Sequence, residues 1–179
     1  AFRVPSALAA EVAVPGRDLW MLKLSEDKIT PLIGAVQRND LAVAKEYLTN
    51  HSGDVCDHLG VSLLMMAAFE GHSEMCKVIL DSKADVNRED TANSRTALMY
   101  AAQNGDSKTV EVLLAAGADA TKVDKELNSA LSWAAVAGKT STVKLLLPHT
   151  DTALKNAQGL TAMELALKNN HKDVVELLK

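Results

Sequence analysis

The sequence predicts an all-α solenoid built from five similar units and preceded by a short leader. Five segments that open on Ser or Thr follow one another at intervals of 32, 34, 33 and 32 residues. A fixed period in this range is typical of stacked repeat arrays rather than of one globular domain. Aromatic residues make up only 3% of the 179 residues. Because β-sandwiches and barrels of this size need more of them on their strands, we exclude an all-β fold.

The first half of each unit predicts a short helix with a hydroxyl residue at its N-terminus. The aligned segments are Thr30–Val36, Ser62–Ala68, Thr96–Ala102, Ser129–Ala135 and Thr161–Leu167. A Ser or Thr hydroxyl at this position can accept a hydrogen bond from a free amide of the first turn, and Pro31 suits a first helical turn. Paired alanines such as Ala67 and Ala68 let neighbouring first helices approach closely.

The second half of each unit predicts another helix. Fourteen and seventeen residues after each hydroxyl, the sequence returns to residues of mostly apolar type: Ala44, Cys76, Val110, Val143 and Val175, then Tyr47, Ile79, Leu113, Leu146 and Leu178. The polar break between the halves holds a residue suited to a left-handed helix end, either Gly71, Gly105 or Gly138, or Asn39 or Asn170. Each unit therefore reads as helix, tight turn, helix.

This pattern resembles the ankyrin repeat, with its signature D-x-x-G-x-T-P-L-H-x-A-A-x-x-G-H followed by L-L and G-A-D-V-N. The matching segments are Asp57–Gly60, Gly71-His72, Ala84–Asn87 and Gly117–Ala120. The resemblance covers about residues 29–179. It implies an ankyrin-repeat α-solenoid with repeats at about 29–56, 57–90, 91–123, 124–155 and 156–179.

The chain departs from this signature in two places. The histidine of T-P-L-H, which links neighbouring repeats in the family, is replaced in all five copies, by Ile33, Met65, Met99, Ser132 and Glu164. The hairpin glycine is kept at Gly60 and Gly159 but replaced by Ser94 and Leu127. Because such residues disfavour left-handed backbone, we expect irregular hairpins there and less rigid stacking than in an idealised array.

Both ends of the chain leave alternatives open. Residues 1–28 do not fit the repeat and predict a short helix from Ser6, which Pro15-Gly16 would end. We interpret this leader as an N-terminal helical cap, with a docking segment or a remnant of a preceding domain as the alternative. The chain starts with Ala1 and stops inside an apolar helical pattern, like a piece of a longer or processed chain. Either the array continues beyond Lys179 or the last helix is its C-terminal cap.

Nothing in the sequence indicates catalysis, so we expect neither enzyme activity nor a cofactor. No P-loop, dinucleotide-binding, zinc-protease or nucleophile-elbow motif occurs. Cys56, His58 and His51 are the nearest approach to zinc ligands, but their spacing matches no structural zinc site. Cys76 falls at an apolar position of a second helix and is expected in the core. His72 and His171 match the family's Gly-His step and are expected to serve the turn between helices.

Composition also limits the compartment and the partners. Two cysteines are too few for a disulfide framework and read as reduced thiols of an intracellular protein, cytoplasmic or nuclear. No apolar run approaches the length of a membrane span, and a net charge of -4 argues against nucleic-acid binding. No small-molecule substrate is expected. Asn87 resembles the asparagine that intracellular hydroxylases modify in many ankyrin proteins, although the favoured interpretation is an ordinary turn residue.

The resemblance implies a concave face formed by the first helices and the turns, with the second helices on the convex back. The residue four positions after each hydroxyl faces this groove: Gly34, Met66, Tyr100, Trp133 and Leu165. The predicted partner-binding residues are Met66, Phe69, Glu70, Tyr100, Gln103, Asn104, Trp133 and Val136. Aromatic and methionine anchors with a polar rim are typical of binding hot spots. The alternative is that the large residues only pack between repeats.

We therefore expect a non-catalytic protein-interaction scaffold or adaptor that binds a partner protein or a linear peptide in this groove. Five stacked units give a groove of about 40 Å, which accommodates roughly a dozen extended residues. The alternative function is a regulatory or targeting module of a larger enzyme, such as a protein kinase or a ubiquitin-ligase component.

Overall fold

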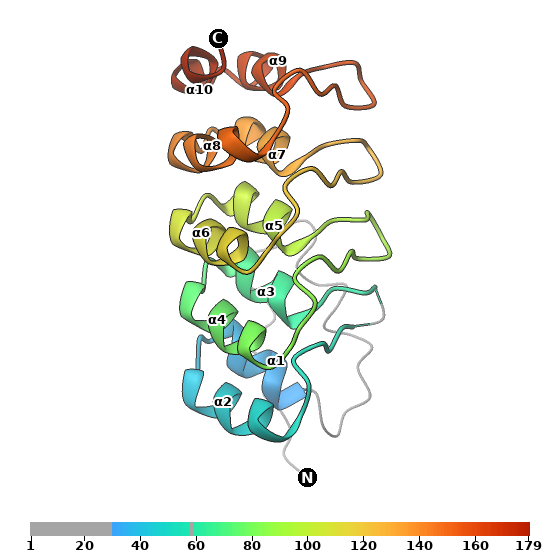
Figure 1. The fold of residues 1–179 in the computed structure, drawn as a ribbon, viewed down its shortest axis with the longest axis vertical. Coiled ribbons are helices and arrows are strands. Elements are labelled where there is room, and N and C mark those ends of the chain that lie inside the picture. The colour runs from blue at the N-terminus through green and yellow to red at the C-terminus, as the bar shows by residue number, and fades with distance from the viewer. Residues whose placement is uncertain (1–29, 58) are drawn as a thin grey trace, which may run out of the picture.

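The computed structural model describes residues 30–57 and 59–179, which form one stack of helix pairs (Figure 1). In chain order the helices are α1 (Thr30–Gln37), α2 (Leu41–Asn50), α3 (Leu63–Glu70), α4 (Ser73–Asp81), α5 (Ala97–Asn104), α6 (Ser107–Ala115), α7 (Ala130–Val136), α8 (Thr140–Leu146), the 3-10 turn η1 (Leu147–His149), α9 (Ala162–Lys168) and α10 (Lys172–Leu177). The helix–turn–helix units predicted from the period are confirmed. The predicted leader cap at 1–28 lies outside the described residues.

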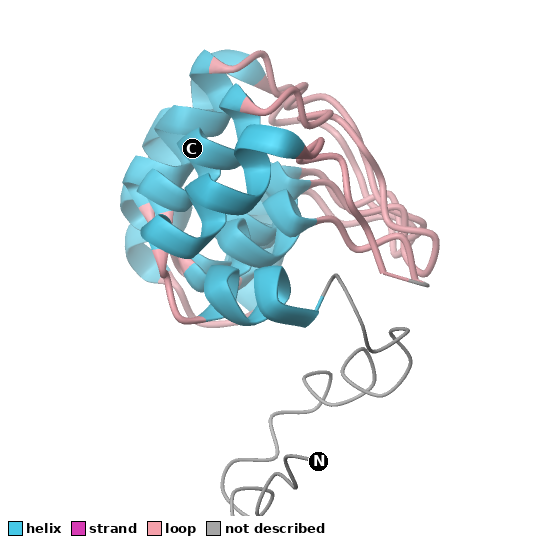
Figure 2. Ribbon diagram, turned by 90° about the horizontal axis from the view of Figure 1, so that it is seen from below, coloured by secondary structure: helices cyan, strands magenta, loops and turns pink. Residues whose placement is uncertain are grey.

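The stack has two columns of helices and a row of hairpins. The first helices (α1, α3, α5, α7, α9) contact one another along the stack, as do the second helices (α2, α4, α6, α8, α10). The loops that join one unit to the next project from the helices to one side (Figure 2). Within the described ranges, extended pairing is limited to isolated bridges such as Cys56 with Ser62. We call the side formed by the hairpins and first helices the inner surface.

The hydroxyl residues act as N-caps in three of the five units. The side chains of Ser62, Ser129 and Thr161 each accept a hydrogen bond from the backbone amide three residues on. Thr96 was expected to do the same but does not: its hydroxyl is buried and has no hydrogen-bond partner in the described part of the chain. In the first unit the helix begins at Thr30 itself.

The turns between paired helices have the predicted left-handed backbone. Gly71, Gly105 and Gly138 have φ values of 75°, 91° and 67°, and Asn39 and Asn170 have φ values of 57° and 63°. Asparagine therefore takes the place of glycine in the first and last units, as expected.

Irregular hairpins were expected at Leu127 and Ser94, and the hairpin at Leu127 is regular. Leu127 has a φ of 60°, like Gly60 at 73°, and its hairpin is closed by a hydrogen bond from the Asp124 amide to the Asn128 carbonyl. That bond spans four residues, as in the two hairpins that keep glycine, so the expectation of an irregular hairpin at Leu127 is wrong. The leucine adopts the glycine conformation because the surrounding hairpin imposes it.

The other irregularity is present. Around Ser94 the closing bond runs from the Asp90 amide to the Arg95 carbonyl, so this hairpin contains one more residue than its counterparts. The extra residue accounts for the longest interval in the repeat, 34 residues from Ser62 to Thr96.

Replacing Leu127 with Gly is expected to raise the free energy of unfolding by about 0.5–1 kcal/mol. Leucine at positive φ is strained by its Cβ, and the side chain is 47% exposed, so little packing is lost. Gly159 has a φ of 77° and no atom within 4 Å of the position that a Cβ would take, and Gly159→Ala is the matched control. That substitution should lose about 1 kcal/mol from backbone strain alone. Urea unfolding of both variants checks the pair, and a loss of stability in Leu127→Gly would contradict this account.

The core runs continuously through the stack. Side chains such as Leu98, Met99 and Leu131 are 1% exposed, and the paired alanines of the first helices are fully buried. In place of the missing T-P-L-H histidine, the histidines of the Gly-His position are among the residues that link neighbouring units. A ring nitrogen of His72 lies 3.2 Å from the Gln37 carbonyl oxygen, and a ring nitrogen of His171 lies 2.9 Å from that of Val136.

Candidate functional site

Four side chains from three successive units form a row on the inner surface: Phe69, Arg95, Tyr100 and Trp133. The rings of Phe69 and Tyr100 meet edge to face, with their centroids 6.1 Å apart. The guanidinium carbon of Arg95 lies 3.8 Å from the ring centroid of Trp133 and 5.9 Å from that of Tyr100. Arg95 therefore bridges the two rings by cation–π contacts. We call these four residues the aromatic row.

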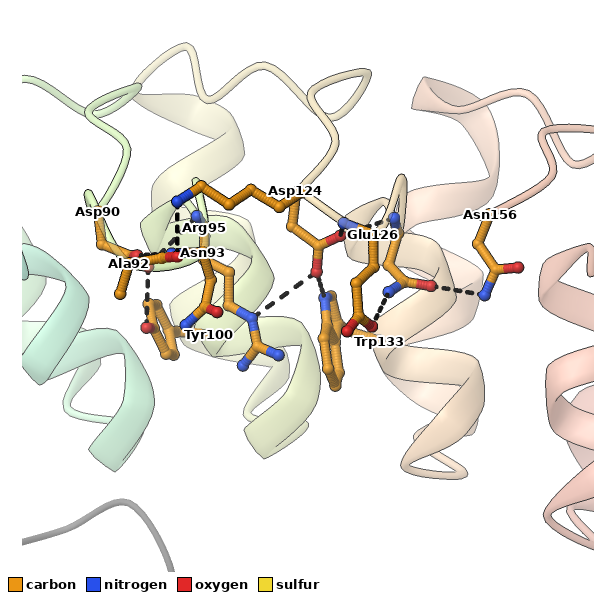
Figure 3. Close-up of polar contacts among 11 residues, drawn as sticks. Asp90, Ala92, Asn93, Arg95, Tyr100, Asp124, Glu126, Trp133 and Asn156 are labelled. Carbon is orange, nitrogen blue, oxygen red and sulfur yellow. Dashed lines mark hydrogen bonds and ion pairs between the residues drawn. The ribbon is translucent and has the colours of Figure 1, made fainter. Parts of the chain in front are cut away.

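Two buried carboxylates fix the orientation of the larger rings (Figure 3). The Tyr100 hydroxyl donates to Asp90 Oδ2 at 3.0 Å, and Trp133 Nε1 donates to Asp124 Oδ2 at 3.0 Å. Burial, followed by the neighbouring Asp90 carboxylate, raises the pKa of the Tyr100 hydroxyl. The phenol therefore keeps its proton, and remains a donor, to a higher pH than an exposed tyrosine does.

The same carboxylates also build the hairpins. Asp57, Asp90, Asp124 and Asn156 occupy equivalent hairpin positions. In Asp124, Oδ1 accepts from the amides of Glu126 and Asn128 at 3.0 and 2.8 Å. One side chain thus closes its own hairpin through one oxygen and holds a ring on the adjoining first helix through the other.

Arg95 was not singled out in the sequence. It immediately precedes the hydroxyl residue Thr96, where the other described units have Val61, Asn128 and Leu160. Its Nε lies 3.7 Å from Asp124 Oδ2 in the next unit. One feature of the sequence could have indicated its role: a basic residue stands directly before the hydroxyl residue in the repeat that precedes Asp124 and Trp133.

The structure brings some of the predicted partner-binding residues together and uses others for packing. Phe69, Tyr100 and Trp133 join the aromatic row and are half-buried, as are Glu70, Gln103 and Val136. Met66 is only 7% exposed, and Asn104 Nδ2 donates to the Phe69 carbonyl oxygen in the preceding unit. Met66 and Asn104 therefore stabilise the stack, whatever they contribute to binding.

The cysteines and histidines give no indication of chemistry. Cys76 is fully buried, as predicted, and burial, followed by the nearby Asp106, raises the pKa of its thiol to about 12. Arg88 Nη1 donates to Cys56 Sγ at 3.7 Å, and the His51 ring stacks on Tyr47. His58 lies outside the described residues. In the part of the chain that the structure describes, no three His, Cys, Asp or Glu side chains are grouped to hold a metal ion.

Asn87 bridges two hairpins. Its Nδ2 donates to the Gly117 carbonyl oxygen at 3.1 Å, and its Oδ1 accepts from the Asp119 amide at 2.7 Å. Both ends of the side-chain amide are therefore hydrogen-bonded within the stack, which agrees with the interpretation of Asn87 as an ordinary turn residue.

The family comparison matches nearly the whole stack. A family model described as ankyrin repeats (three copies) matches residues 15–90, 32–124 and 98–179. The chain belongs to the ankyrin repeat family. The predicted all-α ankyrin solenoid is thereby confirmed, and the five helix pairs of Figure 1 are its repeats.

Curated relatives carry ankyrin repeats inside much longer chains. Palmitoyltransferase AKR1 of Lachancea kluyveri is 32% identical over 144 residues, 76% of this chain and 19% of the relative. The nuclear factor NF-kappa-B p105 subunit of Gallus gallus is 31% identical over 137 residues, 72% of this chain and 14% of the relative. The transient receptor potential cation channel subfamily A member 1 homolog of Caenorhabditis elegans is 33% identical over 119 residues, which are 66% of this chain and 10% of the relative. This chain thus spans less than a fifth of each of these relatives.

Family membership gives the class of function. Ankyrin repeats are protein-interaction modules that bind protein partners, and their fold is typically non-catalytic. None of the helices in the described ranges has both the length and the apolar character needed to cross a bilayer.

Proposed function

We propose that this ankyrin repeat protein is a non-catalytic, intracellular adaptor that binds a partner segment on its inner surface, centred on Tyr100 and Trp133. The observation that carries the proposal is that both rings are fixed by buried carboxylates while remaining half-exposed on adjacent repeats. Both cysteines are free thiols, which supports the intracellular location.

A fixed ring is a better binding anchor than a mobile one. An aromatic side chain that is already held in one rotamer loses little conformational entropy when a partner covers it. The polar atoms of Tyr100 and Trp133 have their hydrogen bonds already, so a partner can bury the rings without leaving an unsatisfied donor. Val136 and Gln103 continue the surface beside the rings, which gives the mixed apolar and polar setting typical of hot spots.

The test is to capture the partner with the folded protein and with the double variant Tyr100→Ala/Trp133→Ala. We expect the affinity for the captured partner to fall at least about 30-fold, the scale of a hot-spot loss of about 2 kcal/mol. Because both rings also stabilise the hairpins, Val136→Lys is the second variant, since it blocks the surface and leaves the ring–carboxylate bonds in place. The control variant on the second helices is Lys108→Ala/Glu111→Ala. Unchanged affinity in both inner-surface variants would overturn the proposal.

The alternative is a regulatory or targeting module of a larger enzyme. The similarity to palmitoyltransferase AKR1, of which this chain spans 19%, favours keeping it. The sequence of the full-length chain distinguishes the two, because a catalytic domain beside the repeats would make binding by this module a means of directing that enzyme.

A further inference from the structure

Acidic side chains are concentrated on the inner surface of the three central repeats. In these three repeats the hairpins and first helices comprise residues 52–70, 85–104 and 118–137. Together they contain nine acidic and four basic residues. The turn and second helix that follow each of these segments contain, together, four acidic and five basic residues. The protein's negative charge therefore lies on the same side as the aromatic row.

The four basic side chains of these segments are already engaged within the protein. Arg88 pairs with Asp54, Lys122 with Glu89, and Arg95 with Asp124, while Lys125 Nζ donates to the carbonyl oxygens of Thr91 and Ala92. All four cations of these segments thus have partners within the protein, and the segments keep a net negative charge that favours a positively charged partner.

Asp57 holds a carboxylate oxygen that no described protein group satisfies. The side chain is 6% exposed, and its Oδ1 accepts from the amides of Leu59 and Val61 at 2.8 and 2.9 Å. Its Oδ2 is buried and has no hydrogen-bond donor among the described residues. A buried acceptor without a donor is costly, so a partner's donor that displaces the side chains over this oxygen would remove that cost.

In the two following repeats, the equivalent carboxylate oxygen accepts a hydrogen bond from an aromatic side chain. The equivalent Oδ2 of Asp90 accepts from the Tyr100 hydroxyl, and that of Asp124 accepts from Trp133 Nε1. In the repeat of Asp57 the residue at the same helix position is Met66, whose thioether has no proton to donate. Asp57 holds the same place in its hairpin as Asp90 and Asp124 do in theirs, next to the first helix that carries Phe69, and the Phe69 ring meets that of Tyr100.

We propose that the partner segment is basic and that one of its lysine or arginine side chains docks between Asp57 and the rings of Phe69 and Tyr100. The proposal rests on the proposed function and specifies the chemistry of the partner. Arg95 provides an internal precedent for a cation held between a ring and a hairpin carboxylate, because its guanidinium stacks on Trp133 and faces Asp124. A cation from the partner would satisfy Asp57 Oδ2 and gain a cation–π contact with the rings.

The direct test measures fluorescence anisotropy with two labelled twelve-residue peptides, one alternating lysine with leucine and one alternating glutamate with leucine. We expect the lysine peptide to bind, with an affinity that falls as salt is raised, and the glutamate peptide not to bind. Asp57→Asn should weaken the lysine peptide at least about tenfold. This variant should fold, because Asn156 closes the equivalent hairpin of the last repeat through its own Oδ1. Glu111→Gln on α6 removes the same charge from the opposite side and should leave binding unchanged.

A second variant separates the docking position from overall charge. Met66 has the same place in its repeat as Tyr100 has in the next one. In Met66→Tyr the new hydroxyl should donate to Asp57 Oδ2 and so block the docking of the partner's cation, without altering the net charge. It should weaken the lysine peptide as Asp57→Asn does.

Wild-type affinity in both variants, or equal affinity for the glutamate peptide, would overturn the inference. If that happens while Tyr100→Ala/Trp133→Ala still loses its captured partner, only the basic character of the partner is wrong. If the ring variants also bind normally, the proposed function itself fails.

Discussion

Asp124→Ala is expected to lower the free energy of unfolding by about 3–5 kcal/mol. The side chain is 4% exposed, accepts hydrogen bonds from two amides of its hairpin and from Trp133 Nε1, and forms an ion pair with Arg95 at 3.7 Å. Its removal leaves three donors of its own repeat unpaired and Arg95 of the preceding repeat without its counter-charge. Urea unfolding monitored by circular dichroism and by tryptophan fluorescence measures the loss.

Asp119→Ala is the matched control for this result. Asp119 lies in the same hairpin, but it is exposed, and among the described residues its side chain accepts only from the amide and hydroxyl of Thr121. We expect it to cost about 1 kcal/mol or less. Asp124→Asn should fall between the two, because its amide oxygen can still close the hairpin while its NH2 group faces the Trp133 donor. A loss for Asp124→Ala no larger than that for Asp119→Ala would show that the ring–carboxylate bonds do not stabilise the stack.

Leu131→Ala is expected to cost about 3 kcal/mol. Leu131 is 1% exposed on α7, between the first helices of the preceding and following repeats, which both contact α7. Truncation removes buried apolar area and leaves a cavity that close-packed helices cannot collapse to fill. The measurement is again the free energy of unfolding.

Leu167→Ala is the control for Leu131→Ala. It is the same substitution in a first helix, but Leu167 is 65% exposed on α9, so the change should stay within about 0.5 kcal/mol. Equal losses at the two positions would contradict a core that runs continuously through the repeats.

The helices and their turns were predictable from the sequence because local rules determine them. A hydroxyl residue, an apolar run and a glycine or asparagine recur at fixed spacing, and each acts within a few residues of itself. The exceptions were also local in origin. The Thr96 side chain makes no cap hydrogen bond although its backbone has the usual N-cap conformation, and Leu127 adopts a glycine conformation because its own hairpin imposes it.

The candidate site was predictable only in outline. Repeat register was enough to place Phe69, Tyr100 and Trp133 on one side of adjacent first helices. It could not show that Met66, at the same register as Tyr100, is buried, because burial depends on the size of neighbouring side chains. Nor could it identify Arg95, whose partners Asp124 and Trp133 belong to the next repeat and are brought to it only by stacking.

The most direct test of binding on the inner surface is site-specific photo-cross-linking to the captured partner. A photoreactive phenylalanine analogue is placed at Gln103, which is half-buried on α5 beside the aromatic row, or at Glu111, which is exposed on α6. We expect the partner to cross-link from position 103 and not from position 111. Cross-linking from position 111 alone would place the partner on the second helices and contradict the account.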